Sequence, residues 1–232
     1  MTEDRLEAKL HEHPLRQQLI THRFFDRVKT EPLDREQVAV FLGQWWHPLH
    51  YFTTFLADCV ASIPDIATKS AVTKILYQES GEGAPDQAHE VIYADTMERV
   101  GFSRQQSTGQ APFEETRKLV ALYERTSKER FAALGSIFAT EVADLAMVSG
   151  IGDAVRRVTG AQELEWVDIH VAQEPDHVQE ADNSLETGFS EAEEARIMES
   201  AEAMWAHWIA FFDRLDGEVF ERGETRARAA VA

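Results

Sequence analysis

The fold is decided by a stretch that reads DREQVAVFLGQWWHPLHYFTTFLADCVAS over residues 34–62. It follows Pro32, and its large apolar side chains would cover most of the surface of a helix. These side chains are Val38, Phe41, Trp45, Trp46, Leu49, Phe52, Phe55 and Leu56. A helix that is apolar on most of its faces is buried among other elements. The stretch therefore predicts the central helix of the molecule.

Helical spacing of apolar residues recurs along the rest of the chain and breaks where prolines and glycines fall. The other predicted helices are 15–28, 66–79, 86–100, 112–126, 128–149, 163–179 and 190–215. Pro175 should kink the helix over 163–179. No stretch alternates convincingly as a strand would. We expect an all-α fold, a compact bundle of about seven helices, as one domain over 1–222 with a frayed tail at 223–232.

Composition and charge argue against several classes of protein. The 232 residues include 23 Lys and Arg against 41 Asp and Glu, a net charge of −18. Such a surface repels phosphate backbones and anionic lipids, so we expect neither a nucleic-acid nor a membrane partner. No apolar run reaches about 18 residues, and the start at Met1 lacks an apolar signal core. The single cysteine, Cys59, fits a reducing compartment. We expect a cytoplasmic protein.

The strongest local motif is His170-Val-Ala-Gln-Glu174-Pro-Asp-His177. Positions i, i+4 and i+7 share one face of a helix. Two imidazoles and a carboxylate on one face can converge on a metal ion. The alternative is a polar face with chance histidines, but nearby Trp166 places this helix in a core. The motif therefore favours a metal site, to which other helices must contribute.

Glu141 is a candidate ligand because it lies among the apolar residues Phe138, Val142 and Met147. Burying a lone carboxylate is costly unless it is paired or binds a metal. The alternative is an exposed position beside Asp144.

A second candidate region reads Glu79-Ser-Gly-Glu82-Gly-Ala-Pro-Asp86-Gln-Ala-His89. Its glycines and proline predict a break in the helix. Glu79 would then end one helix and His89 would begin the next. Both side chains could then face inward. Taken alone, a terminal carboxylate before glycines is more often a solvated cap than a ligand.

Together these residues give the histidines and carboxylates of a carboxylate-bridged di-iron site. Their order, Glu79-x-Gly81-x-Gly83, His89, Glu141 and His170-x3-Glu174-x2-His177, resembles that of the haem-oxygenase-like di-iron oxidases and oxygenases. The likeness covers nearly the whole chain. It implies a haem-oxygenase-like bundle with the metal site between central helices. The implied ligands are Glu79, His89, Glu141, His170, Glu174 and His177, with Glu82 as an alternative first ligand.

The resemblance also implies the chemistry. The cofactors would be two Fe(II) ions, dioxygen would be a co-substrate, and the di-iron centre itself would be catalytic. The substrate would be a small amino-acid-like or fatty-acid-like metabolite of biosynthesis, and the reaction desaturation, oxidative C–C cleavage or N-oxygenation. A homodimer is expected. The sequence departs from the family where Glu174 replaces a frequent aspartate and where Pro175 lies between two ligands.

The substrate pocket is predicted from side chains near the ligands or on the central helix. The candidates are Trp46, His47, His50, Tyr51, Phe138 and Trp166. For the tryptophans, plain core packing is the alternative. Lys74 and Arg156 are candidate partners for a substrate carboxylate, although surface placement is the ordinary fate of both.

Three other functions stay open. A ferritin-like iron-binding bundle would use Glu174-x-x-His177, but His170 has no role there. A metal-independent thiaminase-like enzyme would use Cys59 as nucleophile, but no base lies beside it in sequence, and a buried apolar cysteine is the plainer interpretation. A partner-binding protein would use acidic helical faces such as 190–202, which are usually solvated.

Overall fold

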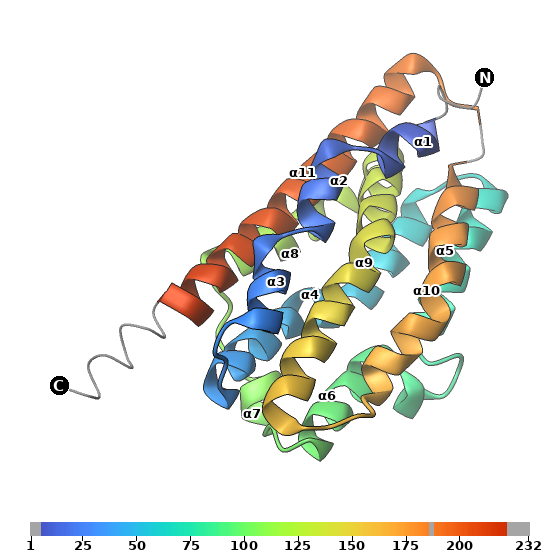
Figure 1. Cartoon of the computed structure of the whole chain (residues 1–232). Helices are drawn as coiled ribbons and strands as arrows, with labels where there is room; N and C mark the ends of the chain where they lie inside the picture. Colours follow the sequence, from blue (N-terminus) through green and yellow to red (C-terminus); the bar gives the residue numbers. More distant parts are fainter. Residues whose placement is uncertain (1–5, 186–187, 222–232) are drawn as a thin grey trace.

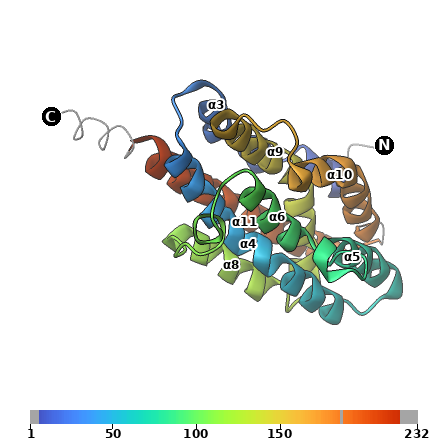
Figure 2. The same ribbon diagram turned by 90° about the horizontal axis from the view of Figure 1, so that it is seen from below.

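The computed structural model describes residues 6–185 and 188–221, which fold as packed helices (Figures 1 and 2). The predicted all-α class is confirmed, and no strand occurs among these residues. The helices are α1 (Leu6–His11), α2 (Pro14–Ile20), α3 (Arg23–Thr30), α4 (Arg35–Ser62), α5 (Ile66–Glu79), α6 (His89–Arg99), α7 (Arg104–Ser107), α8 (Glu114–Thr126), α9 (Arg130–Thr159), α10 (Glu165–Ser184) and α11 (Glu191–Asp216). A 3-10 turn spans Pro85–Gln87 and a π-helical turn spans Gly217–Glu221. The predicted frayed tail lies outside the described residues.

The helix predicted to be central is α4, and it shares the interior with α9 and α11. Asp34 caps α4 in a box with Gln37, each side chain bonding the other residue's backbone N–H at 2.8 Å, which fixes where the helix begins. Helix α9 packs against α11, α10 and α4 (Figures 1 and 2). The three helices therefore form the frame on which the remaining elements pack.

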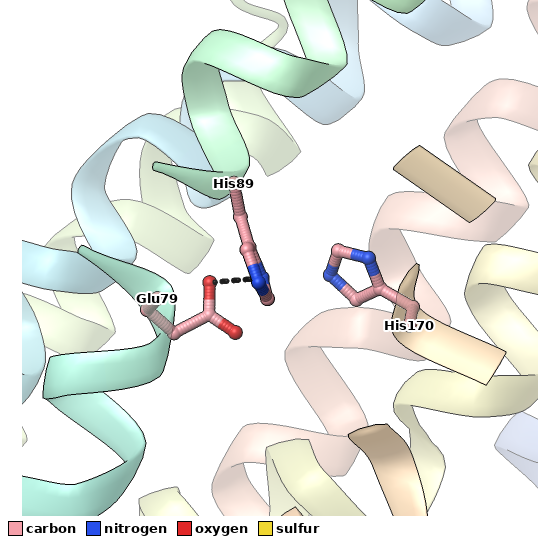
Figure 3. A group of neighbouring side chains, drawn as sticks. All are labelled: Glu79, His89 and His170. Atoms are coloured by element: carbon pink, nitrogen blue, oxygen red, sulfur yellow. Dashed lines mark ion pairs between the residues drawn. The ribbon is translucent and has the colours of Figure 1, made fainter. Parts of the chain in front are cut away.

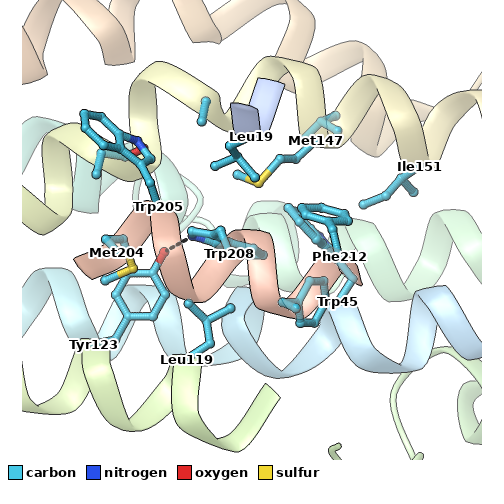
Figure 4. Close-up of a cluster of buried hydrophobic side chains, with 14 of the residues drawn as sticks. Leu19, Trp45, Leu119, Tyr123, Met147, Ile151, Met204, Trp205, Trp208 and Phe212 are labelled. Carbon is cyan, nitrogen blue, oxygen red and sulfur yellow. Dashed lines mark hydrogen bonds between the residues drawn. The ribbon is translucent and has the colours of Figure 1, made fainter. Parts of the chain in front are cut away.

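The core between these helices is rich in aromatic side chains (Figure 4). Trp45 of α4 packs on Trp208 of α11 with ring centroids 5.3 Å apart, and Trp208 continues to Phe212 at 6.0 Å. The indole N–H of Trp208 donates to the hydroxyl of Tyr123 on α8 at 3.2 Å. These contacts between large rings, together with the hydrogen bond of Trp208, give the core its fixed geometry.

The predicted end of α9 at residue 149 is wrong. The helix continues through Gly150 and Gly152 to Thr159 and is capped by Gly160, whose φ of +76° is the left-handed conformation of a C-cap. A Cβ on Gly150 would lie 2.5 Å from Cδ1 of Phe25. At Gly150 the missing side chain therefore allows close packing instead of stopping the helix.

The helix predicted over 15–28 is also wrong, because the chain breaks between α2 and α3. His13 and His22 start these two helices, and each accepts a backbone N–H through Nδ1, from Leu15 at 3.3 Å and from Phe24 at 3.2 Å. Ser, Thr, Asp and Asn are the usual N-caps. Histidine caps therefore gave no recognisable signal in the sequence.

Among the described residues, α9 alone is long and apolar enough to cross a membrane. Its most apolar window is 78% buried inside the fold. The central helix of a bundle has this composition.

Candidate metal centre

A tight turn between α5 and α6 brings Glu79 and His89 together. Glu79 is the last residue of α5 and His89 the first of α6. Gly81 has a φ of +82°, and a Cβ there would lie 2.3 Å from the carbonyl oxygen of Ala84. The turn therefore needs glycine at this position. His89 Nδ1 lies 3.0 Å from Glu79 Oε2 (Figure 3), and both side chains are buried.

Glu82, the alternative first ligand, does not join this group. It lies in the turn with a φ of +54° and is exposed. Its carbonyl oxygen accepts the hydroxyl of Tyr77 at 2.7 Å. Of the two alternatives, the structure therefore brings Glu79 to the site.

Helix α10 supplies the imidazoles of His170 and His177, both buried. His170 Nδ1 lies 2.7 Å from the carbonyl oxygen of Trp166 and must donate to it. This hydrogen bond leaves Nε2 as the nitrogen that could bind a metal and fixes the ring orientation. Glu79, His89 and His170 each offer a ligand atom within 4.8 Å of the others (Figure 3).

Glu141 enters from α9 and is 2% exposed, so the exposed alternative is excluded. Its Oε2 lies 3.4 Å from His177 Nδ1, and Glu79 Oε1 lies 3.9 Å from the same nitrogen. The site thus draws on α5, α6, α9 and α10. Glu174 lies on α10, one turn after His170, but its side chain is outside the described part of the chain.

These side chains fit a metal because their hydrogen bonding is incomplete. Buried atoms with no hydrogen-bond partner include Glu141 Oε1 and His177 Nε2. A buried polar group left in this state costs about 1–3 kcal/mol. A cation bound between them would satisfy these atoms, and carboxylates with imidazoles are the donor set of iron and manganese.

Burial and neighbouring charges shift the pKa values of these groups. Burial alone would raise the pKa of Glu79, but His89, His170 and His177 lower it to about 2. Burial lowers the pKa of His170 to about 4 despite Glu79. Burial would also lower the pKa of His177, but the hydrogen bond and charge of Glu141 raise it to about 9. Without metal, Glu79 is therefore ionised, His170 neutral and His177 protonated near pH 7.

A cavity lies beside these ligands. It is lined by Glu79, Glu141, His170 and His177 and by Trp45, Pro48, Leu49, Phe52, Tyr123, Thr140, Asp144, Trp166 and Trp208. Of the predicted pocket residues, Trp166 therefore lines it. The wall from α4 follows the spacing i, i+3, i+4 and i+7 from Trp45, which is one helical face.

The other five predicted pocket residues do not line this cavity, so the prediction of the pocket is wrong for them. His47 Nε2 contacts the carbonyl oxygen of Gln110 at 2.9 Å. Trp46 stacks on His50 with ring centroids 4.9 Å apart, and Tyr51 is not among the residues that line the cavity. Phe138 is fully buried against His11. The four residues of α4 and Phe138 therefore face other parts of the molecule. Closeness to the ligands in sequence does not show which face of a helix points to the cavity.

The cations proposed for a substrate carboxylate are also placed elsewhere. Lys74 pairs with Glu180 at 2.7 Å and Arg156 with Asp168 at 3.3 Å. No lysine or arginine is among the described residues that line the cavity. Asp144 does line it, and its position one turn after Glu141 is the sequence signal that could have indicated this.

Tyr123 and Thr140 were missed because they act as a pair across two helices. The Tyr123 hydroxyl lies 2.7 Å from Thr140 Oγ1, which donates to the carbonyl oxygen of Ser136. Tyr123 therefore donates to Thr140 and accepts from Trp208, so its hydroxyl is held in place beside the ligands.

Cys59 is fully buried, and burial raises the pKa of its thiol well above the ordinary value. A thiol in that state is a poor nucleophile. The thiaminase-like alternative thus finds no activated cysteine here.

The fold and site together define an all-helical protein with a buried histidine and carboxylate centre of the kind that holds redox iron. The sequence matches the profile of the iron-containing redox enzymes over residues 39–209. The chain belongs to this family, as the resemblance in the sequence indicated.

Comparison with known proteins agrees with this assignment. The chain is 26% identical over 172 residues to 4-chloro-allylglycine synthase of Streptantibioticus cattleyicolor, a match that covers 72% of this chain and 65% of that enzyme. The chain therefore matches less than two thirds of that relative's length.

Solved structures share the fold at low sequence identity. A CADD-like protein of unknown function from Nostoc punctiforme matches with a TM-score of 0.75 at 14% identity, covering 94% of each chain. A TenA homologue from Pseudomonas syringae gives 0.70 at 14%, covering 87% of this chain and 88% of the other. A domain with a haem-oxygenase-like fold from Shewanella denitrificans gives 0.68 at 15%, covering 90% and 89%. These likenesses establish the haem-oxygenase-like fold.

Proposed function

We propose that the protein is a non-haem oxidoreductase that holds two Fe(II) ions and uses dioxygen to oxidise a small amino-acid-like metabolite. The observation that carries this proposal is the convergence of Glu79, His89, Glu141, His170 and His177 in the interior. Their buried atoms lack enough partners within the protein, and a cavity adjoins them.

Glu79, His89, His170, Glu141 and His177 would hold the iron, with Glu174 as a sixth candidate on α10. Bound iron supplies electrons to dioxygen and a place for it to bind. The protein itself orients the metal-binding side chains and excludes water from the site. The carbonyl of Trp166 fixes the ring of His170, and His177 gives up its proton when metal binds.

The cavity favours a substrate that combines an apolar body with an ammonium group. Its wall is largely apolar, and Asp144 is a carboxylate outside the predicted ligand set. A fatty acid would need a counter-charge for its carboxylate, and the described lining offers no lysine or arginine. The relative's name, which describes synthesis of a substituted glycine, agrees with an amino-acid-like substrate.

The test is an anaerobic Fe(II) titration followed by exposure to dioxygen. We expect saturation near two equivalents per chain, as carboxylate-bridged di-iron sites require, and then a transient visible absorption. H170A and H177A should each abolish the reaction with dioxygen. H207A is the matched control, because His207 on α11 bonds the carbonyl of Ala203 and does not line the cavity.

The outcomes separate the candidate functions. Tens of iron atoms per chain would indicate storage by a ferritin-like bundle. Absence of iron binding would contradict both metal functions. Full dioxygen reactivity in both histidine variants would show that the site is assigned wrongly.

A further inference from the structure

A line of aromatic rings in contact leads from the metal centre to the surface. The ring centroids of His170 and Trp166 are 4.5 Å apart, and those of Trp166 and Tyr93 are 5.0 Å apart. Tyr93 continues to Trp46 at 6.1 Å, and Trp46 to His50 at 4.9 Å. Each step is within the range of direct ring contact.

The two ends of this line differ in exposure. Trp166 is fully buried and lines the cavity, and Tyr93 is fully buried behind it. Trp46 is half-buried, and the side chain of His50 is 61% exposed and pairs with Glu90. The line therefore joins the dry site to solvent. Trp46 and His50, which do not line the cavity, lie at the exposed end of this line.

We propose that Trp166, Tyr93 and Trp46 form an electron route from the metal centre to the exposed face around Trp46 and His50, where a small thiol in solution donates electrons to Trp46. Indole is among the side chains that a strong oxidant can deprive of one electron. Tyr93 donates its hydroxyl to the carbonyl oxygen of Leu42 at 2.7 Å, and a carbonyl cannot take up the proton. Tyr93 thus bridges the two indoles and does not remain oxidised itself.

The route rests on the proposed function and acts when dioxygen is reduced without substrate. Four electrons convert dioxygen into two water molecules. The two ferrous ions supply two of these electrons, and the substrate normally supplies the other two. Without substrate, Trp166 gives each missing electron in turn, Trp46 replaces it, and a thiol restores Trp46 with loss of one proton. Two thiols end as one disulfide. In sum, dioxygen, two Fe(II), two thiols and two protons give two Fe(III), one disulfide and two water molecules.

The first test needs no metal, so it decides the route even if the proposed function fails. The metal-free protein is irradiated with tris(bipyridyl)ruthenium and chloropentaamminecobalt(III), which leaves the bulky Ru(III) complex as the oxidant. This complex is too large to reach buried rings, and oxidised tryptophans are located by peptide mass spectrometry. We expect products at Trp46 and at Trp166. In W46F, which keeps the packing but resists one-electron oxidation, the product at Trp166 should be lost.

Matched controls make this result specific. Trp205 is as deeply buried as Trp166 but stacks on His13, outside the line, and it should stay unmodified. Y51F changes a ring of α4 that lies outside this line of contacts and should leave the Trp166 product unchanged. An unmodified Trp166 in the unaltered protein, or equal modification in W46F, would overturn the route.

The second test uses the Fe(II)-loaded protein with limited dioxygen and no substrate. We expect oxidation of Trp46, suppression of that oxidation by added cysteine, and formation of cystine. In W46F the damage should move to Trp166. Thiol consumption that is equal in W46F and the unaltered protein would exclude Trp46 as the donor site. Absence of dioxygen uptake would contradict the proposed function and leave the metal-free result standing.

Discussion

Glu141 is the single residue on which the metal centre depends most clearly. It is buried, one of its oxygens has no partner, and the other lies 3.4 Å from His177. E141Q keeps the shape but removes the charge that binds a cation. We expect its Fe(II) affinity to fall by at least about tenfold, measured anaerobically against a chromogenic chelator. E199Q, at an exposed glutamate of α11, should bind like the unaltered protein, and equal affinity in E141Q would exclude Glu141 as a ligand.

Asp144 is the residue expected to select the substrate. It lines the cavity one turn from Glu141, among apolar side chains. A charged hydrogen bond in such a place contributes about 1.5–3 kcal/mol, so D144N should bind hexylamine about tenfold or more weakly. Quenching of the tryptophan fluorescence would report binding, because Trp45 and Trp208 line the same cavity. D153N is the control on α9, and tighter binding of hexanoate than of hexylamine would reverse the charge assignment.

At the scale of elements, the start of α3 links stability to pH. His22 is buried, accepts the N–H of Phe24 through Nδ1, and approaches Asp213 with Nε2 at 3.3 Å. Burial lowers its pKa in spite of Asp213. The folded protein therefore binds fewer protons here than the unfolded chain. This contribution to stability is present above about pH 6.5, the unfolded value, and is lost as pH falls towards the folded pKa.

The corresponding prediction compares H22N with the unaltered protein. Asparagine can cap the helix but does not titrate. Between pH 7.5 and 5 the unaltered protein should lose more unfolding free energy than H22N, by at most about 1.4 kcal/mol per pH unit. Urea unfolding at several pH values measures this, with H50N as the exposed control. Parallel pH profiles for H22N and the unaltered protein would contradict the role of His22.

Helix α10 should become more ordered when iron binds. His170 and His177 lie on either side of Pro175, which removes one backbone hydrogen bond from the helix. We expect hydrogen exchange over residues 168–180 to slow on addition of Fe(II), and exchange over 191–205 of α11 to change less. Unchanged exchange over 168–180 would show that this helix is already fixed without metal.

The helices were predictable from sequence wherever ordinary caps and spacing define them. The predicted helix over 66–79 has the observed bounds of α5. The errors come from residues whose role depends on distant neighbours. Gly150 looks like a stop until Phe25 is packed against it, and His22 looks like a helix interior until its ring caps α3.

The same limit applies to the site. Glu79, His89, Glu141, His170 and His177 could be proposed from spacing and order, and the structure brings them together. The residues of the cavity wall could not be predicted in this way, because the sequence of an apolar helix such as α4 shows no preferred face. Packing against α9 and against Trp208 of α11 turns Trp45 inward and leaves Trp46 near the surface.

At the scale of the whole molecule, the net charge of −18 separates into two parts. Most acidic side chains lie on solvated helix faces, but Glu79 and Glu141 are buried. Without metal, protonated His177 offsets one of these two negative charges, since its pKa is raised to about 9. That pairing stabilises the fold fully below about pH 6.5 and is lost as pH rises through 9. A bound cation replaces the proton and removes this dependence.

Metal binding should therefore release a proton from His177. At pH 7 His170 is already neutral, since its pKa is about 4, so His170 has no proton to lose. We expect Zn(II) binding to release about one more proton in the unaltered protein than in H177A. Calorimetric titration in PIPES and in HEPES, which bind Zn(II) weakly and differ in ionisation enthalpy, gives the number of protons. The rise in Tm on Zn(II) addition should also grow between pH 6.5 and 9, because the competing proton leaves over that range. Equal proton release in both proteins would mean that His177 is unprotonated before metal binds, and that another group neutralises Glu141.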